Sequence, residues 1–599
     1  MTNPEAPPPP TEPPRRRTER LAMTAAWLAI AVTSITVMKG FVRGPRIGID
    51  YRYFFPRLLD GEWWRMQNGP LAVQWFSPSF CGGVARVPDG QDLSYALPQL
   101  LVRWLDPRDA VVATAVVMAL TGAAGFARLL RRGFGASPEV ATLGVAVMAF
   151  NAAHEARALA GHLAYHGMML IPWACLAVVD PLPEEATARR WRLSADVLLA
   201  GVALAYVVSA GLLNLAAPLG LAVVAVALIH ALHSGAALKR SLRDAAIRLA
   251  AGSVVALALS AAKLAAFASY YGQFRRDFYP LPGADGVLAA ISVTARAVFG
   301  FWAPSGAHIA NAQWVIEAHE LTYGVGPLPA LGLVAAALAW ARAKPRPHYT
   351  QAQRATLLAL GLVVAIPFAI NVYTPMWNAF LKRLPVLSSS SVLFRWWIAY
   401  VFVAPLGLLG FERFAPRARR TVVIAGVAIT LLAALLKARP TEAADAYDPS
   451  RVVLAWHISH DLGVFPPIAT VSSARRNALE DEGLLVEGAS HQLCYEPTFG
   501  YRLERFPRGA LHVGPVDDAR LGVFNLKNPA CYVWPRENRC APGDHFQLSQ
   551  RDALLRFASR RPFAFAMSTR QHVANAVTVT TLVGALGLAA ALAARRFRR

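Results

Sequence analysis

Apolar runs long enough to cross a membrane recur along this chain, with short polar junctions between most of them. The runs lie at residues 21–38, 109–128, 138–153, 163–180, 195–212, 215–233, 248–268, 322–341, 354–372, 393–411, 420–436 and 573–592. A helix needs about 20 apolar residues to cross the hydrocarbon core of a bilayer. Hydrophobic residues make up 55% of the 599 residues and charged residues only 16%. The pattern predicts an all-α polytopic membrane protein with about 12 transmembrane helices.

Basic clusters at every second junction predict how the chain is oriented in the membrane. In chain order they read RRRTER, RLLRRG, EEATARRWR, KRSLRDAAIR, RAKPRPH, ERFAPRARR and RRFRR. Because loops rich in Lys and Arg stay on the cytoplasmic side, both termini are expected in the cytoplasm. The same clusters account for the net charge of +23, so we expect no nucleic-acid partner.

The junctions on the opposite, outer side are much longer, and they divide the chain. Residues 1–20 form a Pro-rich tail expected to be disordered. Residues 21–436 form the membrane core, which includes an outer loop at 39–108. Residues 437–571 are expected to form a small exported α/β domain, with RVVLAWHI and GALHVGPV as strands. Residues 572–599 hold the last span and a basic tail, so the protein is expected to work on its outer face.

The exported segment holds three of the five cysteines. In an oxidising compartment, the stretch CYVWPRENRC suggests a Cys531–Cys540 bridge that closes a small loop. A bridge from Cys494 to Cys531 or to Cys81 is the alternative, because sequence does not determine connectivity.

An acidic residue, Asp50, begins the long outer loop directly after the first span. The stretch YRYFFPRLLDGEWWRM behind it mixes aromatic and basic residues. Because Trp and Tyr favour the membrane–water interface, we expect this stretch to lie along the bilayer surface, anchored by Tyr53, Trp63 and Trp64. A helix cap is the alternative role for Asp50.

A second group of ionisable residues lies between the third and fourth runs, in NAAHEARALAGHLAYH. It contains His154, Glu155, Arg157, His162 and His166. Ionisable side chains at the edge of a membrane are costly unless they have a function, and substrate binding is one such function. In a helix, His162 and His166 would share a face and could hold a metal. Since no carboxylate stands beside them at a suitable spacing, hydrogen-bonded structure is the favoured role for this pair.

Two further sites follow from residue type. Arg395 stands at the outer end of the tenth run, where it could bind a lipid phosphate through two parallel hydrogen bonds or extend to the headgroups. Asp89 and Asp92, in PDGQDLSYALPQL, are candidate metal ligands, although capping of their own loop is the favoured role.

One span, an acidic residue just outside it, a long outer loop and many short-looped spans resemble the GT-C superfamily of membrane glycosyltransferases. The local match is DYRYFFP followed by DGEWWRMQNGPLAVQWFSPSFCGG, with its acidic residue, Pro, Gly and Trp. The resemblance implies a GT-C-like enzyme of the bacterial inner (cytoplasmic) membrane. It would transfer a sugar, with inversion, from a polyprenyl-phosphate donor in the lipid bilayer to an envelope glycan, lipid or protein acceptor.

The resemblance also implies roles for single residues. Asp50 would be the catalytic general base, which takes the proton of the acceptor hydroxyl. The substrate-binding residues would be Arg52, His154, Glu155, Arg157, His162 and Arg395. No soluble nucleotide cofactor is implied; a few members of the family use a divalent cation.

Three other functions remain open. Twelve spans with cytoplasmic termini are common among secondary transporters, and Lys263 inside the seventh run favours that function. Against it, the two halves of this chain differ, whereas transporters usually show internal repeats. An envelope glycan polymerase or ligase would use the same lipid donor, and a non-enzymatic assembly factor would bind partners through the exported domain.

Overall fold

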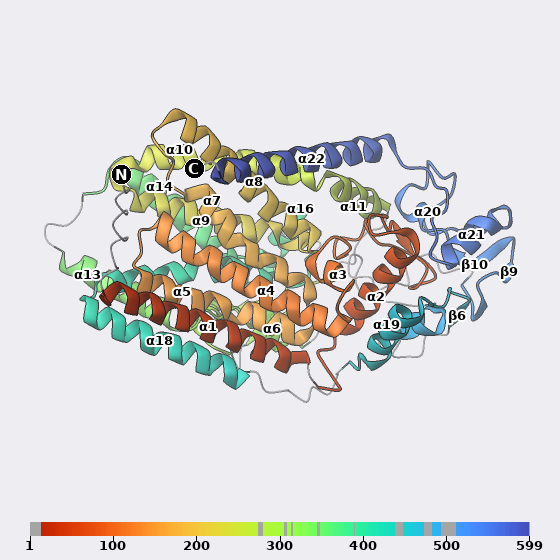
Figure 1. Cartoon of the computed structure of the whole chain (residues 1–599), viewed down its shortest axis with the longest axis horizontal. Helices are drawn as coiled ribbons and strands as arrows, with labels where there is room; N and C mark the ends of the chain where they lie inside the picture. The colour runs from red at the N-terminus through yellow and green to blue at the C-terminus, as the bar shows by residue number, and fades with distance from the viewer. Residues whose placement is uncertain are drawn as a thin grey trace, which may run out of the picture.

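In the computed structural model the chain forms an elongated bundle of helices with a mixed helical and stranded cap at one end (Figure 1). The first turn of α1 (Pro14–Val42) and the last turn of α22 (Thr569–Phe597) lie at the other end of the bundle (Figure 1). The structure describes residues 14–42, 44–273, 279–302, 304, 308–312, 315–343, 348–388, 390–437, 447–472, 482–492 and 511–597.

A helix overlaps each of the twelve apolar runs, but not all of these helices are long. Within the described ranges, eight helical segments are long and apolar enough to cross a membrane. They contain α1 (Pro14–Val42), α4 (Pro107–Arg128), α8 (Ala186–Ser209), α9 (Ala216–His233), α14 (Gln351–Ala369), the η6–α17–η7 segment (Leu393–Trp397, Ile398–Val403, Ala404–Arg413), α18 (Pro416–Lys437) and α22 (Thr569–Phe597).

The other four runs form shorter or broken helices. Helices α10 (Leu238–Leu259) and α11 (Ala261–Gln273) are bent by 68° relative to each other, and counting them as one span gives up to nine. The remaining runs form α5 (Pro138–Ala149), η2 and α7 (Leu163–Leu170, Ile171–Val179) and α13 (Leu328–Arg342). The expected count of about 12 spans is therefore not confirmed by helix length and composition.

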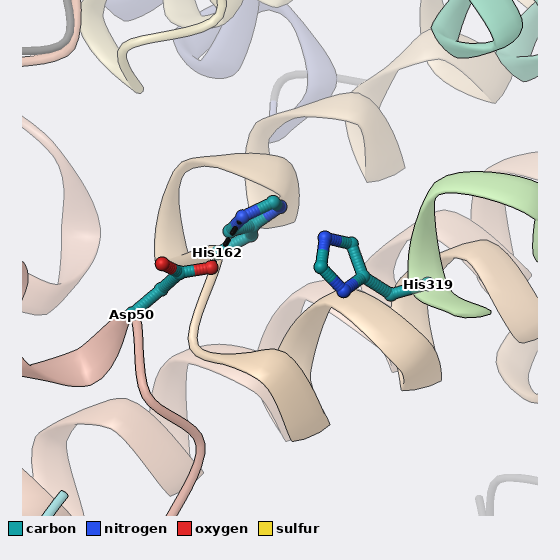
Figure 2. A group of neighbouring side chains, drawn as sticks. All are labelled: Asp50, His162 and His319. Atoms are coloured by element: carbon teal, nitrogen blue, oxygen red, sulfur yellow. Dashed lines mark ion pairs between the residues drawn. The ribbon is translucent and has the colours of Figure 1, made fainter. Parts of the chain in front are cut away.

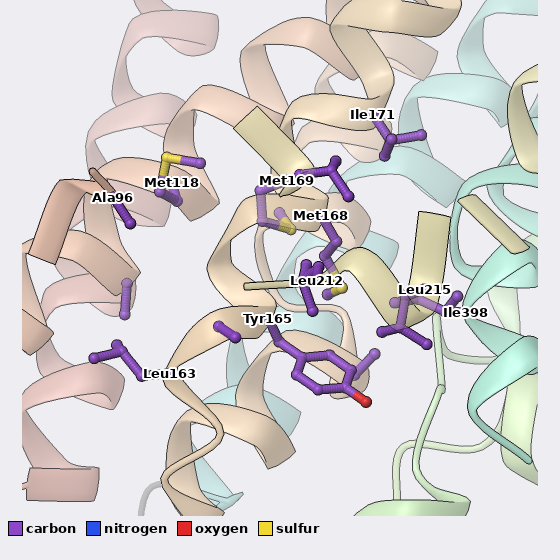
Figure 3. Packing of buried hydrophobic residues seen from close by; sticks show 14 of the residues in the cluster. Ala96, Met118, Leu163, Tyr165, Met168, Met169, Ile171, Leu212, Leu215 and Ile398 are labelled. Carbon is purple, nitrogen blue, oxygen red and sulfur yellow. The ribbon is translucent and has the colours of Figure 1, made fainter. Parts of the chain in front are cut away.

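The short helix α5 shows why an apolar run need not be a full span. Its side chains from Val140 to Ala149 are all buried, because α4, α18 and α1 surround it. Helix α5 ends before Asn151, whose side chain accepts from the backbone N–H of His154 and so begins the next helix, α6 (Ala152–Ala160). Figure 3 shows part of the buried core, where Met168 lies beside Leu212 and Met118 and Met169 belong to the same cluster.

The aromatic side chains expected to anchor the outer loop on the bilayer are buried inside the protein, so that part of the expectation is wrong. Its helix α2 (Tyr51–Asn68) is buried along most of its length. Tyr53, Trp63 and Trp64 are buried inside the protein, where Trp63 stacks on Phe465 with ring centroids 5.3 Å apart. The sequence could not show this, because a cap that packs over the loop offers aromatic side chains the same half-polar surroundings as headgroups do.

The cap combines the outer loop with the C-terminal segment. The loop contributes β1 (Phe76–Ser77), β2 (Val84–Ala85) and α3 (Leu97–Leu101). The C-terminal segment contributes sheet β7-β6-β8 (Ala489–His491, Thr470–Ser472, Gly514–Pro515), sheet β11-β10-β9 (His545–Gln547, Val523–Lys527, Ala519–Arg520) and helices α19 (Ser450–Leu462), α20 (Ala530–Val533) and α21 (Arg551–Ala558).

One of the two expected strands of this segment is a helix. The stretch RVVLAWHI lies in α19, which buries Val452, Trp456 and Ser459, one helical turn apart from each other. This spacing of 4 and then 3 residues marks a buried helical face, and the alternation that a strand needs is missing. In the stretch GALHVGPV, the described strand is Gly514–Pro515.

The cysteines of the cap are partly paired within the described ranges. Cys531 and Cys540 form a disulfide with their Cα atoms 5.8 Å apart. Cys81 is also disulfide-bonded, while Cys494 lies outside the described residues.

A further three-stranded sheet and several short helices come from the part of the chain between residues 279 and 388. The sheet has the order β4-β3-β5 (Ile309–Ala310, Gly283–Asp285, Val372–Tyr373). The helices are α12 (Gly286–Phe299), η5 (Ala318–Leu321), α15 (Pro375–Leu381) and α16 (Pro385–Ser388).

Candidate functional site

Asp50, His162 and His319 come together from three distant parts of the chain (Figure 2). Asp50 precedes α2, His162 follows α6, and His319 belongs to η5. One oxygen or nitrogen atom from each side chain lies within 4.8 Å of the other two.

The backbone at Gly161 brings the first two of these residues together. Gly161 ends α6 in the left-handed conformation, with φ of 100°. A Cβ atom there would lie 2.4 Å from the backbone nitrogen of Tyr51, so only glycine allows this close approach. The backbone N–H of Asp50 donates to the carbonyl of Ala160 at 3.1 Å, which holds the two segments in register.

The hydrogen bonds of His162 determine which of its ring nitrogens carries the hydrogen. Its Nε2 lies 2.5 Å from Oδ2 of Asp50, and its Nδ1 lies 3.1 Å from Nη1 of Arg157. A guanidinium can only donate, so Nδ1 accepts and the hydrogen is on Nε2, pointing at Asp50. Burial, opposed by Asp50, lowers the pKa of His162, in keeping with a neutral ring.

The pKa of Asp50 is lowered, so its carboxylate is ionised at neutral pH. Burial alone would raise the pKa, but the neighbouring His162, His319 and Arg52 outweigh it. The side chain is 34% exposed. Its Oδ1 atom has no hydrogen-bond or ion-pair partner among the described residues, which leaves one carboxylate oxygen available.

His319 lies between two carboxylates and across the ring of His162. Its Nδ1 is 3.1 Å from Glu317 and its Nε2 is 3.6 Å from Glu320. The ring stands at 80° to that of His162, with centroids 4.6 Å apart. Burial disfavours the charged ring, but the two glutamates outweigh it and raise the pKa of His319. Nδ1 faces Glu317 at hydrogen-bond distance and Nε2 faces Glu320 from further away, so His319 carries positive charge more readily than a free histidine.

Glu320 connects the cluster to two arginines. Arg157 donates to it at 3.0 Å, and Arg395 donates from Nε at 3.0 and 3.1 Å and from Nη2. Burial raises the pKa of Glu320, but these two cations outweigh burial and hold it well below the usual value. Arg157 also donates to the hydroxyl of Tyr323 at 2.8 Å. The arginines are therefore fixed in place by a shared carboxylate.

A cavity of about 70 Å³ lies against this cluster, lined by residues that include Asp50, His162, Tyr165 and Arg395. The share of liquid volume of one water is about 30 Å³, so the cavity accepts a small polar group and a whole sugar would need it to widen. The buried hydroxyl of Tyr165 has no hydrogen-bond partner in the described part of the chain. An unpaired buried donor is costly unless a ligand or water completes it.

Two histidines and one carboxylate are also a set that can hold a divalent cation. A metal would need the lone pair of Nε2 of His162, with the ring hydrogen moved to Nδ1. The donor from Arg157 occupies Nδ1, so the observed hydrogen bonds oppose that arrangement. The positive charge favoured at His319 opposes it as well.

The structure brings together four of the residues singled out from the sequence: Asp50, Arg157, His162 and Arg395. Arg52 is close enough to contribute to the lowered pKa of Asp50.

The remaining rim residues have other partners. His154 is buried and lies 3.1 Å from the carbonyl of Ala115, and burial lowers its pKa to about 4. Glu155 forms an ion pair with Lys437 at 2.6 Å, and His166 lies 2.9 Å from the hydroxyl of Tyr206. His162 and His166 are not on one continuous helix, because α6 ends before His162 and η2 begins after it.

The two candidate metal ligands of the outer loop, Asp89 and Asp92, each have protein partners. Each accepts a backbone N–H from two residues further on, at 2.9 Å, as loop-capping side chains do. Asp89 also accepts from the hydroxyl of Tyr53 at 2.8 Å, and Asp92 is paired with Arg86 at 2.7 Å. Lys263 donates to the backbone carbonyl of Asp92 at 2.6 Å.

Sequence reasoning missed His319, Glu320 and Tyr165. The first two lie in the stretch EAHE, inside a long outer segment without a motif of its own. Two acidic residues and a histidine directly before an apolar run are the signal that could have found them. Tyr165 looked like part of the apolar run that follows it.

Comparison with known proteins yields distant structural likeness only. No family model and no curated protein matches the chain. In its apo form, the oligosaccharyltransferase of Archaeoglobus fulgidus superposes with a TM-score of 0.39 at 12% identity, over 78% of this chain and 64% of that one. The same enzyme tethered to an acceptor peptide gives 0.40 at 14%, over 79% and 64%. Its complex with Zn and sulfate gives 0.38 at 14%, over 77% and 62%. This chain thus spans under two thirds of that protein's length, and the functional argument rests on its own residues.

Proposed function

We propose that the chain is a membrane glycosyltransferase that moves a sugar from a polyprenyl-phosphate donor to an envelope acceptor on the outer face of the membrane. The observation that supports this most is the position of Asp50. One of its carboxylate oxygens is bound by His162 and the other is available, at the wall of a cavity that Arg395 also lines. A base and a phosphate-binding cation beside one cavity are the two groups that this reaction needs.

Asp50 acts as the general base in this proposal. The acceptor hydroxyl attacks the anomeric carbon, the carbon–oxygen bond to the phosphate breaks, and its electron pair leaves with the phosphate oxygen. The hydroxyl becomes acidic as its oxygen forms the new bond, so a carboxylate of lowered pKa can take its proton. His162 holds the carboxylate in place through Nε2, and Arg157 holds His162 through Nδ1.

Arg395, His319 and Tyr165 face the charge that develops on the departing phosphate. Arg395 uses Nε and Nη2 for Glu320, which leaves the hydrogens of Nη1 for a ligand. The raised pKa of His319 favours a second cation within the same cluster. The hydroxyl of Tyr165 supplies a neutral donor that lacks a partner among the described residues. Donors that are already in place stabilise such charge without reorganisation.

The test is transfer of radiolabel in membranes that contain the full chain. Undecaprenyl-phosphate-linked radiolabelled hexoses and pentoses are added one at a time, and label in lipid, glycan and protein fractions is counted. With the sugar that is transferred, Asp50→Asn should lower the rate by about 10²- to 10⁴-fold, the range that a general base contributes.

The matched control is Asp109→Asn, because Asp109 is an exposed aspartate at the same end of α4 as the cap. It should transfer label at the wild-type rate. Full activity of Asp50→Asn would remove Asp50 as the base. Uptake of sugar into proteoliposomes without transfer would favour a transporter.

A further inference from the structure

A groove of about 940 Å³ lies at the end of the bundle opposite the candidate site, between α4, η1 (Leu129–Gly133), α7, α8 and α22. Four arginines line it: Arg128, Arg132, Arg192 and Arg595. They belong to the ends of α4, η1 and α22 and the start of α8. The C-terminal end of α22 lines the groove, and Figure 1 shows that end of the helix away from the cap.

Two of these arginines are held in place without a carboxylate. The guanidinium of Arg128 lies 4.9 Å from the ring centroid of Trp173, and that of Arg595 lies 5.0 Å from that of Trp191. Neither has an ion pair among the described residues. A stacked guanidinium keeps its in-plane N–H groups for other acceptors.

The other two arginines are partly neutralised. Arg132 pairs with the buried Asp180 at 3.1 Å, and Arg192 pairs with the same aspartate and with Asp196 at 3.1 Å. Among the described lining residues, one carboxylate, Asp196, stands against four arginines, and Asp180 pairs with two of those arginines, so the lining keeps a net positive charge. A ligand that fits this charge must be an anion.

The rest of the groove is apolar and lies along the membrane-spanning helices. Its walls include Leu176 on α7, Leu198 and Leu199 on α8, and Leu592 on α22. The apolar window of α22 has none of its residues buried inside the protein, so this helix lies at the outside of the bundle. The groove thus joins a cationic end at headgroup depth to an apolar part at acyl-chain depth.

We propose that this groove binds one anionic glycerophospholipid, with its headgroup phosphate among Arg128, Arg132 and Arg595. Its acyl chains lie between α8 and α22. A free phosphate would use only the arginines, whereas a lipid uses the apolar walls as well. The site is separate from the one that contains Asp50, and it does not rest on the proposed function.

The experiment measures lipid bound to the purified, delipidated full chain by native mass spectrometry, with phosphatidylglycerol and phosphatidylcholine as probes. We expect preferential binding of phosphatidylglycerol. Arg128→Gln/Arg595→Gln should weaken it about thirtyfold, since two arginines contribute about 1 kcal/mol each and 1.4 kcal/mol is a factor of ten. The control, Arg417→Gln/Arg420→Gln, changes two exposed arginines of α18 at the same end of the bundle and should have no effect.

A second variant, Leu592→Trp, fills the apolar part on the outermost helix without a change of charge. It should weaken phosphatidylglycerol binding too, and it keeps the test valid if the double variant does not fold. Equal loss in the Arg417/Arg420 control would show general attraction to a basic surface and would overturn the proposal. Binding that Leu592→Trp leaves unchanged would point to a headgroup or phosphate ligand alone, and would also overturn it.

Discussion

Asp50 and Asp60 are ten residues apart in the same outer loop, yet their surroundings differ in kind. The side chain of Asp60 is 0% exposed, and that of Asp50 is 34% exposed. Asp60 accepts from Arg560 at 3.0 Å, from Gln74 at 2.7 Å and from Ser79, and Arg86 lies 3.5 Å away. Both oxygens of Asp60 are therefore occupied, whereas one oxygen of Asp50 is not.

The difference separates a carboxylate that holds the structure together from one that is available for chemistry. Arg560 comes from the C-terminal part of the cap and also donates to the carbonyl of Pro466 at 2.7 Å. Asp60 and Arg560 thus bind the outer loop to the C-terminal segment, with no atom left for a ligand. Asp50 is held by a single histidine beside a cavity. Charge alone would not tell them apart; burial and the occupancy of their oxygens do.

The largest effect is expected from Asp60→Ala. It leaves Arg560 buried and without its carboxylate, which typically costs about 3–5 kcal/mol. Thermal unfolding in detergent should show a large fall in Tm, or the variant should not accumulate in membranes. Asp50→Asn, measured alongside, should unfold near the wild-type temperature, because its side chain is half-buried and has one partner. Equal destabilisation by the two variants would break the comparison.

Much of this arrangement could be predicted from the sequence, and particular residues show where prediction stops. The apolar runs predicted the helices, because a segment that is buried or crosses a membrane is recognisable from its own composition. Asp50 and Arg395 were found because a charged residue beside a span is rare enough to need a reason. The pairing of Asp50 with His162 requires Gly161, which lets the backbones of the two segments come into contact. The burial of Asp60 requires an ion pair with Arg560, 500 residues further along the chain. No local pattern carries either fact.

A smaller effect is expected from Arg157→Met, which tests whether one hydrogen bond keeps a metal out of the site. Without the donor at Nδ1, the hydrogen of His162 can move there and Nε2 can bind a cation. Binding of Mn²⁺ or Zn²⁺, measured by calorimetry on the purified chain, should tighten about 10- to 100-fold, the range by which hydrogen-bond partners of ligating histidines change affinity. Glu320 keeps its bonds to Arg395, so the variant should fold.

The control for this prediction is the double variant Arg157→Met/Asp50→Asn, which should lose the gained affinity. If the wild-type chain already binds the cation as tightly as Arg157→Met does, then Arg157 does not determine the tautomer of His162. Asp50 and His162 would in that case form a metal site, and Asp50 would no longer have a free role as base.

The smallest effect is expected from Glu317→Gln. Glu317 is 62% exposed and bonds Nδ1 of His319, and with Glu320 it raises the pKa of that ring. An exposed pair of this kind contributes at most about 1 kcal/mol, so Tm should hardly change. A raised pKa means that the stabilising contribution is fully present below about pH 6.5, the usual value for histidine, and is lost as pH rises through the folded-state pKa. If the charged ring supports transfer, activity should fall on the alkaline side at a lower pH in Glu317→Gln than in the wild type.

Glu139→Gln, which changes a glutamate of α5 at the opposite end of the bundle, should leave the pH profile of transfer unchanged. An unchanged pH profile for Glu317→Gln would mean that the charge of His319 does not contribute to transfer. Arg395 would then face the phosphate without a second cation from His319.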